Sequence, residues 1–197
     1  MHRTLTLADL SERDRQLVEA ARDASVNAYA PYSGFAVGAA VRTKSGRSYS
    51  GANLENASYG LGICAEVSVM AVASAAADLD VEAIAVVGHK FTEPQDSSQL
   101  VTPCGRCRQV IFEASQVSNV DVRVFSCTGD LSQIVECTIS ELLPAAFGPK
   151  NLGLDEAWPE MRSQLRAAVA RLAGKARVGT TSHTGLPRAP RHAASKR

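Results

Sequence analysis

The chain has 197 residues, of which 45% are hydrophobic and 21% charged, so it is long enough for one ordinary domain with a buried core. Its formal net charge of +1 indicates neither a nucleic-acid partner nor a membrane partner. Beyond Glu160, however, every charged residue is basic, so the chain ends in a basic segment.

The cellular location is predicted from the start of the chain and from its cysteines. The first residues, MHRTLTLADLSERD, contain no apolar run of signal-peptide length, and no stretch approaches the roughly 18 apolar residues of a membrane span. We therefore expect a cytoplasmic protein. An odd number of cysteines in an unsecreted protein argues against a disulfide framework and favours metal or catalytic roles. The five cysteines are Cys64, Cys104, Cys107, Cys127 and Cys137.

The first half of the chain predicts a helix, a β-hairpin and a second helix. The first helix begins at Ser11, where S-E-R-D resembles a capping box. The hairpin turns at residues 44–47. The second helix is apolar on all sides, which predicts that it is buried. The ranges are 11–28 for the first helix, 35–43 and 48–53 for the strands, 56–63 for a polar loop and 64–77 for the second helix.

The second half alternates strands and helices. This order, after an opening hairpin, favours a three-layer α/β/α sandwich on a mixed sheet. The last part is rich in Gly, Ser, Thr, Pro and basic residues, which predicts disorder. The ranges are 82–87 and 120–126 for strands, 104–115 and 139–143 for helices, 155–173 for an amphipathic helix and 174–197 for a disordered basic tail.

Two groups of cysteines lie at the predicted starts of helices. Cys64 begins C-A-E, and Cys104 and Cys107 belong to P-C-G-R-C. Helix N-termini favour thiolates, because unpaired N–H groups and the helix dipole stabilise anions. Three thiolates would give zinc three protein ligands and an open fourth position, which is the arrangement of a catalytic site. That position would hold a water whose pKa zinc lowers toward neutrality.

Glu66 is the one charged residue of its predicted helix and lies two residues after Cys64. A carboxylate beside an activated water can take its proton and deliver it to a substrate. Two other interpretations stay open here: a C-x-x-C redox pair, and a structural zinc site completed by Cys127 or Cys137. Glu66 alone would fit an acid favoured by the helix dipole. Together, C-A-E and P-C-x-x-C match the general signature of zinc-dependent cytosine and adenine deaminases.

The sequence resembles the homotetrameric cytidine deaminases over roughly residues 12–150. The matching stretches are YAPYSGFAVGAAV, GANLENASYGLGICAE, VTPCGRCRQV and ELLPAAFGP. The resemblance implies an α/β/α sandwich with a mixed five-stranded sheet and one zinc ion per subunit. It also implies hydrolytic deamination of cytidine and 2′-deoxycytidine, releasing ammonia, in pyrimidine salvage.

The resemblance also assigns roles to individual residues. It implies that Cys64, Cys104 and Cys107 bind zinc and that Glu66 shuttles protons. The implied substrate-binding residues are Asn53 and Glu55 for the ribose hydroxyls, Phe35 for the pyrimidine ring, the backbones of Ala65 and Pro103 for the edge of the base, and Tyr59 and Phe147, which neighbouring subunits of a homotetramer contribute.

Four parts are expected along the chain, and the expected ligand is a small-molecule nucleoside. We expect neither a membrane nor a nucleic acid as partner. The parts are an N-terminal extension (1–10), a cytidine deaminase-like catalytic domain (11–150), a helical extension (151–173) and the disordered basic tail (174–197).

Val67 departs from the family pattern. Many tetrameric cytidine deaminases have Arg at this position, where it offsets the charge of three thiolates; Arg106 or Arg108 is a candidate replacement. The residues around Val67 also resemble blasticidin S deaminase, which acts on a bulky nucleoside antibiotic, so deamination of such an antibiotic is the alternative function. A zinc-bound scaffold and a nucleic-acid-binding module are weaker alternatives, because Glu66 is intact and the basic tail lacks interleaved aromatic residues.

Overall fold

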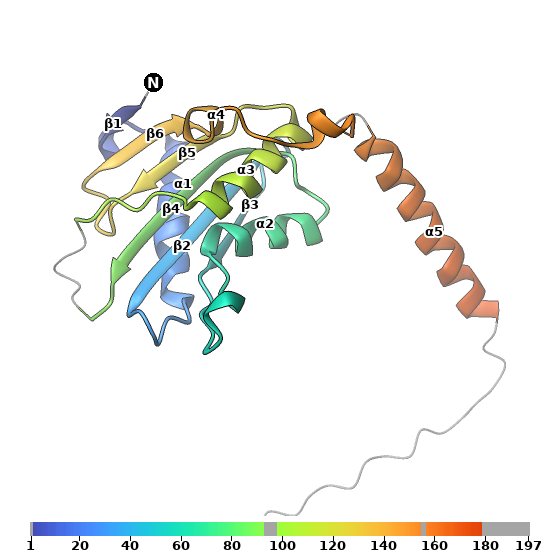
Figure 1. Ribbon diagram of the computed structural model, residues 1–197, viewed down its shortest axis with the longest axis horizontal. Helices are drawn as coiled ribbons and strands as arrows, with labels where there is room; N and C mark the ends of the chain where they lie inside the picture. The colour runs from blue at the N-terminus through green and yellow to red at the C-terminus, as the bar shows by residue number, and fades with distance from the viewer. Residues whose placement is uncertain (1, 93–97, 155–156, 179–197) are drawn as a thin grey trace, which may run out of the picture. The chain divides into compact units, whose positions relative to one another are not determined.

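The structure is a computed structural model that describes residues 2–92, 98–154 and 157–178. It divides into two compact units, Met1–Asp155 and Glu156–Arg197. The first unit is built on a six-stranded sheet with the order β1-β6-β5-β4-β2-β3 (Figure 1). The strands are β1 (Arg3–Leu5), β2 (Phe35–Thr43), β3 (Ser48–Ala52), β4 (Val81–Lys90), β5 (Arg123–Cys127) and β6 (Ile134–Thr138). The helices of this unit are α1 (Glu12–Ala24), α2 (Ala65–Ala75), α3 (Gly105–Ser118) and α4 (Ile139–Leu142).

The sheet is mixed, and helices cover both of its faces. β4 and β5 pair in parallel, whereas the other neighbouring strands pair antiparallel. Figure 1 shows α1 behind the sheet and α2 and α3 in front of it. The α/β/α sandwich predicted from the sequence is therefore confirmed.

Side chains along the central strands alternate between the two faces of the sheet and so contribute to two hydrophobic cores. On β4, Ile84 and Val86 join the core that includes α2 and α3, whereas Ala85 and Val87 join the core that includes α1. Successive side chains of a strand point to opposite faces, so a fully buried strand feeds both cores. This explains why the central strands show continuous apolar runs.

Two glycines allow α1 and α2 to lie close to the sheet. A Cβ atom at Gly38 of β2 would lie 2.0 Å from the carbonyl oxygen of Ala21 in α1. A Cβ atom at Gly51 of β3 would lie 2.8 Å from the backbone nitrogen of Val69 in α2. The backbones at these points leave no room for a side chain, so the depth at which α2 sits depends on Gly51.

The start of α1 follows its sequence signal. Ser11 is the N-cap residue, and its hydroxyl accepts a hydrogen bond from the backbone N–H of Asp14. The same hydroxyl donates to the Asp14 carboxylate at 2.8 Å. The predicted capping interaction at Ser11 is confirmed.

The sheet has six strands rather than five, and the sequence expectation was wrong on this count. β1 and β6 were not predicted. β1 has only three residues and pairs antiparallel with β6, and β6 carries Glu136, a charged residue that weakens the strand pattern. Residues 1–10, expected as an extension, contain β1 and the buried Leu10.

The second unit contains α5 (Trp158–Val178). The sequence predicts a disordered tail from Gly174, whereas α5 continues to Val178. The remainder of that tail, from residue 179, lies outside the described residues. Within the described ranges, no helix is long and apolar enough to cross a membrane.

Candidate active site

Three of the five cysteines converge at the N-termini of two helices. Cys64 is the N-cap residue of α2 and Cys104 is the N-cap residue of α3, while Cys107 lies in the first turn of α3. The three Sγ atoms lie within 4.8 Å of one another, and those of Cys104 and Cys107 are 3.4 Å apart. Among the residues that the structure describes, no fourth Cys, His, Asp or Glu belongs to this group.

The cluster fits a zinc ion. Sulfur ligands at the usual zinc–sulfur distance of about 2.3 Å would lie roughly 3.8 Å from one another in a tetrahedron. The observed separations span that value, so small side-chain rotations would complete the site. Thiolates are also ligands that zinc prefers. The structural site with a fourth cysteine has no support in the described residues, because Cys127 and Cys137 are buried elsewhere and contact the carbonyl oxygens of Phe125 and Val124.

Burial decides the direction of the pKa shift for two of these three thiols. It raises the pKa of Cys64 and of Cys107. For Cys104, burial acts in the same direction, but hydrogen bonds from the backbone N–H of Cys107 and from the neighbouring thiols outweigh it and lower the pKa. The helix N-terminus alone therefore does not ionise all three thiols, and a bound dication would provide the compensating charge.

Glu66 is the second residue of α2, and 4% of its surface is exposed. Burial raises the pKa of its carboxyl group above the ordinary value. A carboxyl group in such surroundings exchanges protons more readily near neutral pH than an exposed one does.

A cavity of about 370 Å³ joins Glu66 to the cysteine cluster. This volume is suited to a small organic ligand. Most of the site residues predicted from the sequence lie together on its wall. The predicted residues that line it are Asn53, Glu55, Tyr59, Cys64, Ala65, Glu66 and Cys104. Lining residues that the sequence did not single out are Val37, Leu54, Gly62, Ile63, Val101 and Thr102.

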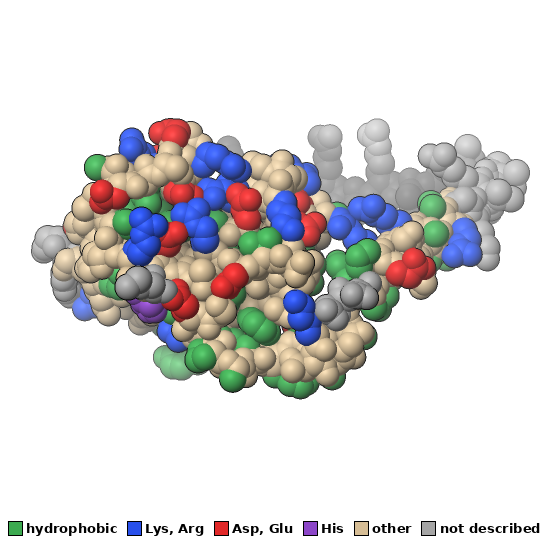
Figure 2. Space-filling model, turned by 90° about the horizontal axis from the view of Figure 1, so that it is seen from above, with side chains coloured by type: hydrophobic (Ala, Val, Ile, Leu, Met, Phe, Trp, Pro, Cys, Tyr) green, Lys and Arg blue, Asp and Glu red, His purple; other side chains and the backbone are tan. Residues whose placement is uncertain are grey.

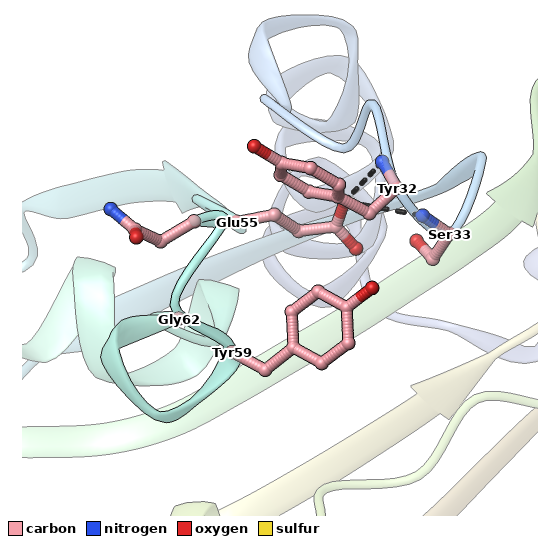
Figure 3. Close-up of a pocket in the computed structure, with 6 residues that line it drawn as sticks. Tyr32, Ser33, Glu55, Tyr59 and Gly62 are labelled. Atoms are coloured by element: carbon pink, nitrogen blue, oxygen red, sulfur yellow. Dashed lines mark hydrogen bonds between the residues drawn. The ribbon is translucent and has the colours of Figure 1, made fainter.

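A second cavity, of about 350 Å³, shares Glu55, Tyr59 and Gly62 with the first. Here the Glu55 carboxylate accepts hydrogen bonds from the backbone N–H groups of Tyr32, at 2.9 Å, and Ser33, at 3.3 Å (Figure 3). Figure 3 shows the Glu55 carboxylate between the rings of Tyr32 and Tyr59, whose centroids are 6.0 Å apart. A hydrogen bond from the Ser33 side chain, together with those backbone donors, lowers the pKa of Glu55. Glu55 is thus an oriented, ionised acceptor.

Asn53 is held by the edge of β2. Its Oδ1 accepts from the backbone N–H of Val37 at 2.9 Å, and its Nδ2 donates to the carbonyl oxygen of Phe35 at 3.1 Å. Each of these two atoms can make one further hydrogen bond. The side chain therefore has a fixed orientation and still has donor and acceptor capacity toward the cavity.

A backbone pair fixes the loop between Asn53 and Cys64. Leu54 and Ile63 exchange two hydrogen bonds, at 2.9 and 2.8 Å, and so close the intervening loop. Arg106 of α3 donates to the carbonyl oxygen of Gly62 in the same loop at 3.2 Å. These contacts bring Glu55 and Cys64 to one cavity although they are nine positions apart in the sequence.

Phe35, Pro103 and Phe147 are not among the described residues that line either cavity. Phe35 is half-buried and packs over Gly88 beside Val101, which does line the cavity. Pro103 is buried, and its carbonyl oxygen accepts from Arg108. Phe147 is 62% exposed. Their assigned roles stay predictions.

The two candidate replacements for the missing Arg at position 67 bind backbone carbonyls. Arg106 donates to Gly62, as described above. Arg108 donates from Nε to the carbonyl of Pro103 at 2.8 Å and from Nη1 to the carbonyl of Leu142 at 3.1 Å. These hydrogen bonds position the segments around the cysteines rather than the thiols themselves.

A buried carboxyl group beside a three-cysteine cluster, on an α/β/α sandwich, defines the class of hydrolytic zinc enzymes with an open metal position. The chain belongs to one family of that class: the model of the cytidine and deoxycytidylate deaminase zinc-binding region matches residues 11–123. The resemblance seen in the sequence is confirmed.

Individual relatives agree with the family model. A cytidine deaminase of Halalkalibacterium halodurans is 44% identical over 142 residues, which cover 71% of this chain and 98% of the relative. A cytidine deaminase of Sporosarcina psychrophila is 36% identical over 137 residues, covering 70% and 93%. The crystal structure of cytidine deaminase from Burkholderia pseudomallei is similar with a TM-score of 0.59 and 38% identity, covering 70% of this chain and all of that one.

Proposed function

We propose that this protein catalyses the zinc-dependent hydrolytic deamination of cytidine and 2′-deoxycytidine to uridine and 2′-deoxyuridine, with release of ammonia. The observation that carries the proposal is the buried carboxyl group of Glu66 on the wall of the same cavity as Cys64 and Cys104. Family membership and the names of the relatives support the same reaction.

Cys64, Cys104 and Cys107 would hold one zinc ion, which supplies the Lewis acidity that makes a water molecule acidic near neutral pH. Glu66 accepts the proton of the attacking water and holds it in the buried carboxyl group. It then delivers protons to N3 of the base and to the departing amino group. One C–O bond forms at C4, one C–N bond breaks, and ammonia leaves.

The other end of the cavity suits a hydroxylated sugar. The Glu55 carboxylate is oriented by two backbone donors and accepts hydrogen bonds from hydroxyl groups. Asn53 offers one remaining donor and one remaining acceptor beside it. A site with such groups disfavours a substrate without hydroxyls, because its own polar groups would stay unpaired. Free cytosine is therefore expected to be a poor substrate.

Contacts to the base complete the proposal. Phe35 packs against the pyrimidine, and the backbones at Ala65 and Pro103 bind its edge. Ala65 is fully buried on the cavity wall. Phe35 does not line the cavity but lies next to Val101, which does. These positions allow the base to enter with C4 toward Glu66.

We also propose a homotetramer in which neighbouring subunits contribute Tyr59 and Phe147 to each site. Tyr59 is 81% exposed at the mouth of the cavity. Leu54 and Leu61, on the same loop, are exposed as well, and a second subunit would cover them. A role in pyrimidine salvage and a cytoplasmic location stay predictions.

The test is the ultraviolet change that accompanies loss of cytidine, measured beside blasticidin S and with Glu66→Gln as control. We expect cytidine turnover, a decrease of about 10²- to 10⁴-fold in Glu66→Gln, and unchanged zinc content in that variant. Turnover of blasticidin S alone would assign the protein to the alternative function. Zinc binding without turnover of either compound would contradict the proposal.

A further inference from the structure

The charges of this chain are divided unevenly between its two parts. Residues 1–157 contain 12 Lys and Arg and 19 Asp and Glu, a net charge of −7, whereas residues 158–197 contain 9 and 1, a net charge of +8. The near-neutral total therefore hides an acidic catalytic part and a strongly basic C-terminal part. Such a separation directs the basic part toward anionic surfaces.

α5 combines this charge with an apolar stripe. Five large apolar side chains recur at spacings of three and four residues, which places them on one face of the helix. They are Trp158, Met161, Leu165, Val169 and Leu172. All five are exposed, from 39% to 66%. Figure 2 shows hydrophobic and basic side chains next to one another along this helix.

Arginines border the stripe on one side. Helical geometry places Arg162 and Arg166 along this border, whereas Arg171 comes eleven residues after Glu160 and so lies on the same side of the helix as that acid. Glu160, the one acidic residue of α5, lies on the opposite face, where it accepts a hydrogen bond from Gln164. The helix thus presents apolar side chains with cations along one border, and its acid lies on the far side.

We propose that α5 binds the surface of an anionic phospholipid bilayer, with the stripe at the level of the head groups and the arginines on the phosphates. A nucleic acid would use the charge but leave the stripe exposed to water. A second α5 would bring like charges together, and the position one heptad after Met161 is the small Ala168, which interrupts a coiled-coil seam. An anionic lipid surface offers a partner for both features, the apolar stripe and the positive charge.

The same surface repels the acidic part of the chain. A net charge of −7 keeps residues 1–157 away from anionic lipid while the C-terminal part is attracted. The proposal revises the expectation of no membrane partner and does not depend on the deaminase activity.

The test uses the full-length protein and vesicles of phosphatidylcholine with or without phosphatidylglycerol. Trp158 is the only tryptophan of the chain, so its fluorescence reports on the stripe directly. We expect co-sedimentation with the anionic vesicles and a shift of the emission to shorter wavelength. Binding to neutral vesicles is expected to be weaker by about tenfold or more, and added salt should weaken the anionic binding.

Two double variants with equal charge separate the stripe from the charge. Leu165→Glu with Leu172→Glu is expected to reduce binding by about tenfold or more and to abolish the fluorescence shift. Ala167→Glu with Ala170→Glu, away from the stripe, is expected to cost less than about threefold. Cytidine turnover should match the unmodified protein in both, which shows that the catalytic part of each variant folds, and equal far-ultraviolet circular dichroism of the two variants shows that both keep α5.

Three results would overturn the proposal. Equal losses in both double variants would show that charge alone acts. Equal binding to neutral and anionic vesicles, or binding to a polynucleotide without binding to vesicles, would assign another partner. Self-association without vesicles that Leu165→Glu abolishes would identify a second copy as the occupant.

Discussion

The cysteines of this chain fall into two groups, one at the candidate metal site and one in the sheet. Cys64, Cys104 and Cys107 converge beside the cavity, whereas Cys127 and Cys137 lie in β5 and β6 as small hydrophobic side chains. Burial raises the pKa of Cys127 to about 12, which makes it an inert thiol. Cysteine chemistry in this protein is thus set by position in the fold.

Replacement of one cysteine from each group should separate these roles. We expect Cys104→Ser to lose stoichiometric zinc and deaminase activity, because two thiolates and a hydroxyl bind zinc far more weakly than three thiolates. Cys137→Ser is the matched control and should keep zinc and turnover. Zinc content by mass spectrometry of the native protein and cytidine turnover check both variants. Full zinc occupancy in Cys104→Ser would contradict the assignment.

The residues of the site could be predicted where chemistry and spacing coincide. C-A-E and P-C-x-x-C identify the thiols and the acid, because few other roles need those residue types at helix N-termini. Tyr32 and Ser33 could not be found that way. Both donate to Glu55 from backbone N–H groups, which leave no trace in residue type, and the Ser33 side chain adds a further hydrogen bond. A turn beginning A-P-Y-S-G was the only available signal.

At the scale of elements, the first turn of α3 fastens two segments to the site. Arg108 bridges the carbonyls of Pro103 and Leu142, and Gln109 donates to the carbonyl of Phe147 at 2.9 Å. The Arg108 bridge connects the loop before Cys104 with the last residue of α4, and Gln109 binds the segment after α4. Arg108 is therefore a positioning residue for the site.

Arg108→Lys should weaken this bridge. A lysine presents one ammonium in place of a fork and cannot hold both carbonyls in the same geometry. We expect kcat/KM for cytidine to fall by about tenfold with zinc content unchanged, since hydrogen bonds from charged donors are worth about 1.5–3 kcal/mol. Arg106→Lys is the control, because Arg106 makes a single bond to Gly62 that lysine can replace. Equal losses in both variants would refute the role of the bridge.

A buried ionic network joins α1 to the sheet. The Asp14 carboxylate contacts Arg42 of β2 at 2.9 Å and Arg123 of β5 at 3.1 Å. Arg42 also pairs with Glu82 of β4. Burial alone would raise the pKa of Asp14, but hydrogen bonds from Arg123, Ser11 and Arg42 outweigh it and lower the pKa below the ordinary 3.8.

Asp14→Asn should destabilise the fold in a pH-dependent way. The variant leaves the buried Arg42 partly unpaired, and we expect a loss of about 3 kcal/mol at pH 7. Because the folded-state pKa of Asp14 is depressed, its stabilisation is complete above the unfolded value and disappears as pH falls through the lower folded value. The difference between wild type and variant should therefore shrink below about pH 3.8. Urea unfolding at several pH values measures it, with the exposed Asp23→Asn as a control that should change stability by less than about 0.5 kcal/mol.

Elements differ in how well the sequence predicts them. β2 was predicted with the bounds that the structure shows, Phe35–Thr43, because its β-branched residues lie next to a clear hairpin turn. β6 was missed because its pattern contains Glu136, whose partners, Arg3 and Arg123, lie on the two neighbouring strands. When the partners of a charged residue lie on other strands, the sequence around that residue does not show them, and the charge then suggests a loop.

On the scale of the whole molecule, the catalytic part and the C-terminal part are separable. The Halalkalibacterium halodurans relative is matched over 98% of its length by 142 residues of this chain. Unit Met1–Asp155 contains the sheet and both cavities. The C-terminal part therefore lies outside the length that this relative shares.

Removal of residues 158–197 should leave cytidine turnover unchanged within about twofold, because the sheet, the cysteine cluster and both cavities belong to the other unit. The net charge of the protein would change from +1 to −7, so the shortened protein should be retained strongly on an anion exchanger. Steady-state kinetics and ion-exchange elution check these expectations against the full-length chain. A loss of turnover of more than about tenfold would show that the C-terminal part takes part in catalysis.

The pairing of β1 with β6 has a consequence for the order in which the strands can pair during synthesis. In the order of synthesis, Arg3–Leu5 comes before the other strands that the structure describes, yet the strand with which it pairs, Ile134–Thr138, is the last of them. At about 5–20 residues per second, the roughly 130 residues between the two strands take about 7–26 s to synthesise. The first of the described strands is thus among the last to be paired, and until then its edge is open to other nascent chains.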